Sequence, residues 1–135
     1  MSDISARRDL SNFGVPMDRW TKPFWDATAR HELQFPQCGD CGRFRWPPGP
    51  FCPGCRSQNT AWKEAGQGHV YSFTIIRDKV TAQSFVPALI EFPRAGGVRL
   101  VASIVDTPLD VIETGASVKQ SWIYAGEVAV PVFEI

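Results

Sequence analysis

Cys38-Gly39-Asp40-Cys41 and Cys52-Pro53-Gly54-Cys55 contain all four cysteines of this 135-residue chain. Each stretch is a tight turn that presents two thiolates, and two such turns facing each other can close a tetrahedron around one Zn²⁺ ion. Four thiolates also suit iron, whereas disulfides are the weaker alternative in a reducing compartment. The sequence therefore predicts a closed, structural metal site and favours zinc over iron. Its ligands are Cys38, Cys41, Cys52 and Cys55.

The chain before the cysteine pairs falls into two parts. Residues 1–15 are polar and lack a sustained periodicity, so we expect a mobile arm or a segment that docks on another surface. From Trp20 onward, apolar side chains recur at helical spacing, Thr21 can cap, and Pro23 is tolerated in a first turn. A helix over residues 21–31 follows, and its aromatic side chains must pack on the rest of the protein or on a partner.

The chain after the cysteine pairs has the pattern of β structure. Short runs rich in Val, Ile, Phe and Tyr alternate with glycine and proline turns. The expected strands are 70–76, 86–92, 98–105, 118–124 and 128–133, with a helical turn at 107–110 between the third and the fourth. The predicted fold class is mostly β, with an N-terminal helix, a four-cysteine zinc ribbon and a five-stranded OB-like Greek-key barrel; a sandwich is the alternative.

We divide the chain into an N-terminal arm and helix (1–34), a zinc ribbon (35–65) and an OB-fold barrel (66–135). Fourteen basic and fourteen acidic side chains give a formal charge of zero, which offers no electrostatic attraction to nucleic acid or anionic membranes. The longest apolar runs, Phe85–Ile90 and Val128–Phe133, are far shorter than the about 20 residues of a membrane-spanning helix. The charged N-terminus lacks the apolar stretch of a secretory signal, so we expect a cytoplasmic protein.

A self-contained catalytic site is not expected. With all four cysteines on metal, no thiol nucleophile is left, and the two histidines are His31 and His69. The hydroxyls of Ser72, Thr74 and Ser103 fall within strand patterns, where such residues usually belong to a sheet face. The sequence therefore points away from a free-standing hydrolase.

The order of these elements resembles a known family. The motifs that carry the resemblance are Phe24-Trp25 with Leu33, both cysteine pairs with Pro47-Pro48 between them, Gly68–Thr74, Pro87–Glu91, Gly97–Leu100, Ile112–Gly115 and Val130–Phe133. Together they are similar to the acyl-CoA-associated OB-fold proteins with a rubredoxin-like zinc ribbon (domain of unknown function 35). The sequence departs from that pattern at Gly49, where a basic residue often follows the paired prolines, and at Arg56, where glycine is usual.

The resemblance implies an accessory subunit of a thiolase-superfamily enzyme, such as a thiolase, an acyltransferase or an aldolase. The partner would supply the nucleophile, while this chain stabilises it and shapes access for acyl-CoA. Two alternatives stay open, a module that binds single-stranded nucleic acid and a free-standing acyl-CoA carrier.

Basic side chains are the candidates for contact with the phosphates of CoA, because guanidinium and ammonium groups pair with phosphate oxygens. They are Arg43, Arg45, Arg56, Arg77 and Lys79. Each could instead be a solvated charge or pair with the partner. The aromatic side chains of the ribbon, Phe44, Trp46 and Phe51, are candidate anchors at an interface, with packing against the barrel as the equal alternative.

Overall fold

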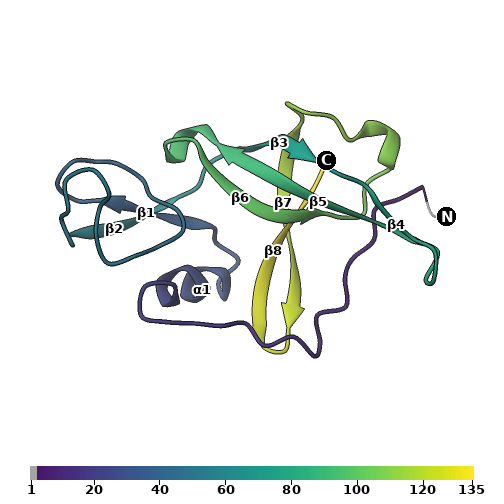
Figure 1. Ribbon diagram of the computed structural model, residues 1–135, viewed down its shortest axis with the longest axis horizontal. Helices are drawn as coiled ribbons and strands as arrows, with labels where there is room; N and C mark the ends of the chain where they lie inside the picture. Colours follow the sequence, from purple (N-terminus) through teal and green to yellow (C-terminus); the bar gives the residue numbers. More distant parts are fainter. Residues whose placement is uncertain (1–2) are drawn as a thin grey trace.

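The computed structural model describes residues 3–135, so Met1 and Ser2 of the expected arm lie outside the described residues. Figure 1 shows a small hairpin, β1 (Gln34–Cys38) with β2 (Thr60–Glu64), at one end of the molecule. A larger sheet occupies the other end, and α1 (Lys22–Thr28) contacts both. The architecture is mostly β with one short α-helix, as predicted.

Six strands form the larger sheet. They are β3 (Gly68–Phe73), β4 (Ile76–Asp78), β5 (Gln83–Phe92), β6 (Val98–Ile104), β7 (Ser117–Ala125) and β8 (Val128–Glu134). The order is β3-β7-β8-β6-β5-β4, and the additional pairing of β3 with β5 closes five of the strands into a barrel. The pairing of β6 with β8 is parallel and the others are antiparallel. This confirms the predicted five-stranded OB-like barrel, to which β4 is added as a short edge strand.

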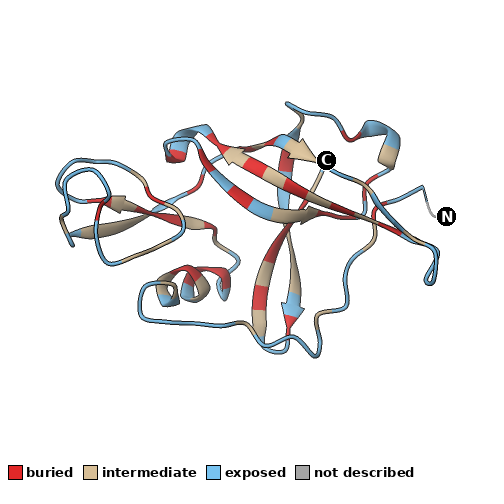
Figure 2. Ribbon diagram, in the orientation of Figure 1, coloured by how far each residue is buried: buried red, intermediate tan, exposed pale blue. Residues whose placement is uncertain are grey.

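Alternating side chains explain why β5 is a strand. Its burial alternates along ten residues, and Val86, Ala88, Ile90 and Phe92 point into the core. A period of two places every second side chain on the same face of a sheet. Figure 2 shows the resulting alternation of buried and solvent-accessible residues along the barrel strands.

The first barrel strand is shorter and less regular than predicted. Its register against β5 shifts between Val70 and Ser72, which leaves Tyr71 as the extra residue of a β-bulge. Strand β3 then ends at Phe73. The N–H of Thr74 still donates to the carbonyl of Pro87 in β5 (3.1 Å), and regular pairing with β5 resumes in β4. At the other end of β3, a Cβ added to Gly68 would lie 2.8 Å from a side-chain carbon of Ile90, so this position requires glycine.

The helix is also shorter than predicted. It covers Lys22–Thr28, because the chain turns at His31, where φ is +57°. Thr21 occupies the N-cap without a side-chain capping bond; instead the carboxylate of Asp18 accepts hydrogen bonds from the backbone N–H groups of Trp20 (2.9 Å) and Thr21 (2.8 Å). None of the helices formed by residues 3–135 is long and apolar enough to cross a membrane.

The described part of the N-terminal arm docks on the barrel of its own chain. The N–H of Ser5 donates to the carbonyl of Thr107 (2.9 Å), and the N–H of Ala6 donates to the carbonyl of Ser84 (2.8 Å). Ser5 is buried. The side chains of Ser5 and Arg7 add further contacts, since the N–H of Thr107 donates to the Ser5 hydroxyl (3.1 Å) and the Arg7 guanidinium pairs with Asp106 (2.7 Å). Single polar residues make these contacts, so no side-chain periodicity in the sequence predicted them.

Helix, ribbon and barrel share one aromatic core. The ring of Phe35 in β1 lies 5.1 Å from that of Phe92 in the barrel and 5.0 Å from that of Trp46 in the ribbon loop. Phe24 of α1 lies 4.9 Å from Trp46, and Phe92 lies 6.0 Å from Phe133. The ribbon is therefore packed against the barrel by side chains from both.

Candidate functional site

The β1–β2 hairpin positions the four cysteines. Cys38 is the last residue of β1 and pairs with Thr60 at the start of β2, while the chain between them forms the two cysteine turns. The sequence did not reveal these two strands, since Pro36 and polar residues break the usual strand pattern. Their pairing nevertheless brings the two ends of the ribbon together.

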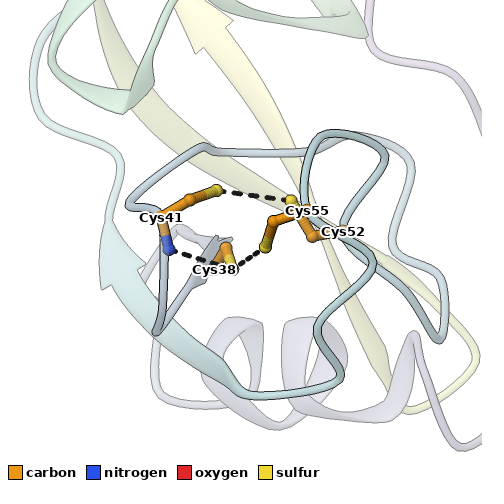
Figure 3. A group of neighbouring side chains, drawn as sticks. All are labelled: Cys38, Cys41, Cys52 and Cys55. Carbon is orange, nitrogen blue, oxygen red and sulfur yellow. Dashed lines mark hydrogen bonds between the residues drawn. The ribbon is translucent and has the colours of Figure 1, made fainter.

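The four sulfur atoms form one compact cluster, as Figure 3 shows. All four lie within 4.8 Å of one another. The Sγ atoms of Cys38 and Cys55 are 3.5 Å apart, and so are those of Cys41 and Cys52. A tetrahedral zinc site with Zn–S bonds of about 2.3 Å has S···S edges of about 3.8 Å. The cluster therefore fits one Zn²⁺ ion, as predicted.

Backbone N–H groups stabilise two of the thiolates. The backbone nitrogens of Cys41 and Asp40 each lie 3.4 Å from the sulfur of Cys38. Both N–H groups lower the pKa of Cys38, and that of Cys41 has the larger effect. The N–H of Cys55 is the main cause that lowers the pKa of Cys52 to about 6. Hydrogen bonds to the charged form of a group favour that form, so these sulfurs are prepared to act as metal ligands.

Cys55 behaves differently in the absence of a cation. Although the N–H of Ser57 lowers its pKa, hydrogen bonding to Cys38 and burial outweigh this effect and raise the pKa to about 12. Four neighbouring thiols cannot all ionise without a balancing positive charge, which a bound Zn²⁺ ion supplies. With four cysteine ligands the site is closed to water and substrate, so its zinc is structural.

Polar contacts hold the two cysteine turns against each other. The carboxylate of Asp40 accepts a hydrogen bond from the hydroxyl of Ser57 and another from the amide of Asn59 (3.3 Å). The N–H of Gly39 donates to the carbonyl of Asn59 at 2.8 Å. A Cβ on Gly39 would lie 2.6 Å from the Asn59 side chain, so glycine allows this close approach.

The five basic candidates do not gather at one place. Arg43, Arg45 and Arg56 belong to the ribbon, whereas Arg77 lies in β4 and Lys79 follows it, at the opposite end of the molecule in Figure 1. Four of them are exposed, and Arg45 is buried. At Arg56, where the family pattern has glycine, the backbone adopts a φ of +66°.

The three aromatic side chains of the ribbon have different surroundings. Trp46 packs into the shared core, and Phe44 is partly buried against it. Phe51 is 54% exposed. Trp46 and Phe44 therefore pack within the chain, and Phe51 is the one of the three candidate interface anchors that stays exposed.

An apolar groove lies where two barrel strands diverge. Strands β6 and β8 pair at one position, Ile104 with Phe133, so residues 100–103 and 130–132 separate and line the groove. Phe24, Trp25 and Trp46 are among the side chains of its other walls. The volume is about 420 Å³. The sequence did not reveal this groove, because it arises from the divergence of strands and not from a motif.

Neither histidine is part of a catalytic arrangement among the described residues. The ring of His31 stacks on Trp122 at 4.9 Å, and its Nε2 forms a 2.7 Å hydrogen bond with the hydroxyl of Tyr124. His69 lies 3.5 Å from the hydroxyl of Ser117, which is the outer limit of a hydrogen bond. No carboxylate within residues 3–135 forms an ion pair with His69, so the orienting group of a nucleophile–base pair is missing there.

Two family models match consecutive parts of the chain. The ChsH2 rubredoxin-like zinc ribbon domain matches residues 25–61, and the ChsH2 C-terminal OB-fold domain matches residues 63–122. A curated relative from Thermomonospora curvata, named as a probable enoyl-CoA hydratase alpha subunit, is 36% identical over 116 residues. The match covers 82% of this chain and 36% of that relative, so the chain spans about a third of its length.

Two solved structures share the fold. A chain of the Ltp2–ChsH2(DUF35) aldolase is 31% identical, has a TM-score of 0.77, and is matched over 98% of its length and 90% of this chain. A DUF35-family protein of unknown function from Sulfolobus solfataricus has a TM-score of 0.65 at 19% identity, over 85% of its length and 88% of this chain. The cysteine cluster, the OB barrel and these matches agree, and the chain belongs to the ChsH2 (DUF35) family of zinc-ribbon and OB-fold proteins.

Proposed function

We propose that this chain is a non-catalytic, zinc-stabilised accessory subunit of a thiolase-like enzyme that makes or breaks carbon–carbon bonds in acyl-CoA substrates. The observation that carries the proposal is the 31% identity to a chain of the Ltp2–ChsH2(DUF35) aldolase over 98% of that chain. The cysteines of this chain are committed to metal, so the partner would supply the nucleophile. In this role the chain stabilises the partner and shapes access to its site, and we expect the assembly in the cytoplasm.

The apolar groove supports a role in acyl-CoA access. Its volume of about 420 Å³ falls within the roughly 300–1,000 Å³ typical of small-molecule sites. The β6 and β8 residues that line it are mostly apolar, as an acyl chain requires. We place the acyl chain of the substrate at the mouth of this groove, at the interface with the partner.

The exposed cations are the proposed contacts for the CoA phosphates. One group, Arg43 and Arg56, lies on the ribbon, and the other, Arg77 and Lys79, lies at β4. Because the two groups lie at opposite ends, one of them binds the phosphates and the other remains solvated. Paired charge reversals, one pair at a time, should raise KM for acyl-CoA with kcat unchanged for the group that binds.

The test of the proposed function is a tagged pull-down from the native host, with the co-purifying protein identified by mass spectrometry. The complex and the isolated chain are then assayed in parallel for thiolysis, acyl transfer and retro-aldol cleavage of acyl-CoA. We expect a stoichiometric thiolase-like partner whose activity depends on this chain, and no turnover by the chain alone. Robust turnover by the isolated chain, or recovery of nucleic acid in place of a protein partner, would overturn the proposal.

Hydration of an enoyl-CoA is the second candidate reaction. It is favoured by the 36% identity to the relative named as a probable enoyl-CoA hydratase alpha subunit. The same complex is therefore assayed with an enoyl-CoA substrate. Hydration without carbon–carbon bond cleavage would select this second reaction, and cleavage without hydration would select the first.

A further inference from the structure

Arg45 is a buried cation whose hydrogen-bonding capacity is only partly used. Its side chain is 8% exposed. Nη2 donates to the carbonyl of Gly49 (2.9 Å) and to the hydroxyl of Thr60 (2.6 Å). Nε and Nη1 are buried and have no hydrogen-bond partner, and no carboxylate within residues 3–135 forms an ion pair with this guanidinium. A buried charge without a counter-charge is unfavourable, so this group is expected to acquire an anion.

A pocket of about 330 Å³ adjoins Arg45 on the ribbon side of the molecule. A second arginine, Arg19, lines the same pocket, together with the amide side chain of Gln58 and the hydroxyl-bearing Thr60. Trp62 and several prolines form its apolar walls. No acidic side chain within residues 3–135 lines the pocket, so its chemistry is that of an anion site.

The geometry points to a binding site for a phosphate group in this pocket, with Arg45 as the principal ligand and Arg19 as the second cation. The planar fork of a guanidinium matches two phosphate oxygens, and two arginines match the charge of a phosphate dianion. Since Nε and Nη1 are covered by neighbouring atoms, the guanidinium turns toward the pocket when the phosphate binds. Inorganic phosphate and the phosphate groups of a nucleotide share this chemistry.

The site is independent of the proposed enzyme partner, because every residue that forms it belongs to this chain. It also differs from the exposed cations considered above. Those four side chains are exposed and do not line this pocket. Arg45 is instead buried beside the pocket, and two of its nitrogens have no hydrogen-bond partner.

The experiment compares thermal melting and calorimetric titration of the zinc-loaded chain in phosphate and in chloride at equal ionic strength. The probes are inorganic phosphate, pyrophosphate and adenosine 3′,5′-bisphosphate, and the comparison among them separates the free ion from a nucleotide as the source. We expect phosphate to raise Tm and to bind with one site per chain. Replacing the charge with an apolar side chain in Arg45→Met should weaken binding roughly 10- to 100-fold, as expected for the loss of charged hydrogen bonds. Arg19→Met should weaken it by a smaller factor.

Two controls make the outcome decisive. Arg94→Met removes an exposed arginine that does not line this pocket and is not among the proposed CoA contacts, so it should leave phosphate binding unchanged. Arg45→Met loses the hydrogen bonds to Gly49 and Thr60 as well as a buried charge, so the phosphate effect on each variant is measured as the difference between its own Tm values in phosphate and in chloride. If Arg45→Met does not fold, phosphate binding is measured in Arg19→Met and Arg45→Lys, and both should bind phosphate more weakly than the parent chain. Equal Tm values in phosphate and chloride, or a phosphate effect that persists in the Arg45 and Arg19 variants, would overturn the site.

Discussion

Phe35→Ala tests whether ribbon and barrel fold as one unit. Phe35 is fully buried, and its ring lies 5.0 Å from that of Trp46 in the ribbon and 5.1 Å from that of Phe92 in the barrel. Truncating a buried phenylalanine costs about 3–5 kcal/mol in the free energy of unfolding, through lost transfer energy and the cavity that remains. For 135 residues, 1 kcal/mol corresponds to about 3.5 °C in Tm, so a decrease of about 10–18 °C is expected.

The assay is urea denaturation followed by tryptophan fluorescence and, in the same samples, by zinc release to a colorimetric chelator. Because both parts share the core, the two signals should change together in the parent and in Phe35→Ala. Phe51→Ala is the matched control, since this phenylalanine is 54% exposed and its loss should change stability by about 0.5 kcal/mol or less. A loss below about 1 kcal/mol in Phe35→Ala, or zinc release at a separate midpoint, would refute the shared core.

Three further changes test the metal site, the barrel and the N-terminal arm. Cys55→Ser should lose zinc and ribbon order, because three thiolates forfeit part of the about 10–16 kcal/mol that structural zinc can contribute; zinc content and circular dichroism measure this. Gly68→Ala should lower stability in urea by about 1–3 kcal/mol, since its Cβ would lie 2.8 Å from a side-chain carbon of the fully buried Ile90. Arg7→Ala should lower stability by at most about 1 kcal/mol and speed hydrogen exchange of the arm, because it breaks a 2.7 Å ion pair with Asp106.

The outcomes that contradict these predictions are specific. Full zinc content with native melting in Cys55→Ser would show that the fourth thiolate is dispensable. Gly14→Ala is the control for the barrel substitution, since a Cβ there meets nothing within 4 Å. Equal stability of the two glycine variants would contradict the close packing of β3 on β5. Unchanged exchange rates in Arg7→Ala would show that the backbone bonds of the arm suffice to dock it.

The sequence predicted the metal site best, because its information is local. Two pairs of cysteines, each enclosing two residues, leave few arrangements other than a tetrahedral cluster. The barrel was predicted nearly as well. The alternation of side chains along β5 follows their burial, and turn residues mark where the strands end. In both cases the residues that form the feature are also the residues that specify it.

The differences have physical causes that a sequence pattern does not record. The N-terminal arm joins the barrel through backbone hydrogen bonds of Ser5 and Ala6 and through single side-chain contacts of Ser5 and Arg7, which form no repeating pattern in the sequence. The bulge at Tyr71 interrupts the predicted alternation without a glycine or proline to mark it. The helix was predicted too long because the backbone of His31 adopts a φ of +57°. A histidine in the sequence does not by itself indicate this left-handed conformation.

The two pockets depend on long-range geometry. The groove beside β6 requires knowing that β6 and β8 pair at one position only. Arg45 was a candidate for phosphate contact by its charge alone, together with four other cations that the structure leaves exposed. Its burial and its unpartnered nitrogens, which distinguish it from the other four, come from the packing of the ribbon loop against β2.

Zinc binding supports the wall of the apolar groove indirectly, by stabilising the ribbon that contributes Trp46 to it. The small ribbon hairpin buries few side chains of its own, and metal binding can supply the stability that so small a unit lacks. Its aromatic residues are therefore available to pack against α1 and the barrel, as the buried Phe35 and the partly buried Trp46 do. Trp46 belongs both to this shared core and to the wall of the groove. A closed metal site can thus determine the shape of a groove that its own ligands do not line.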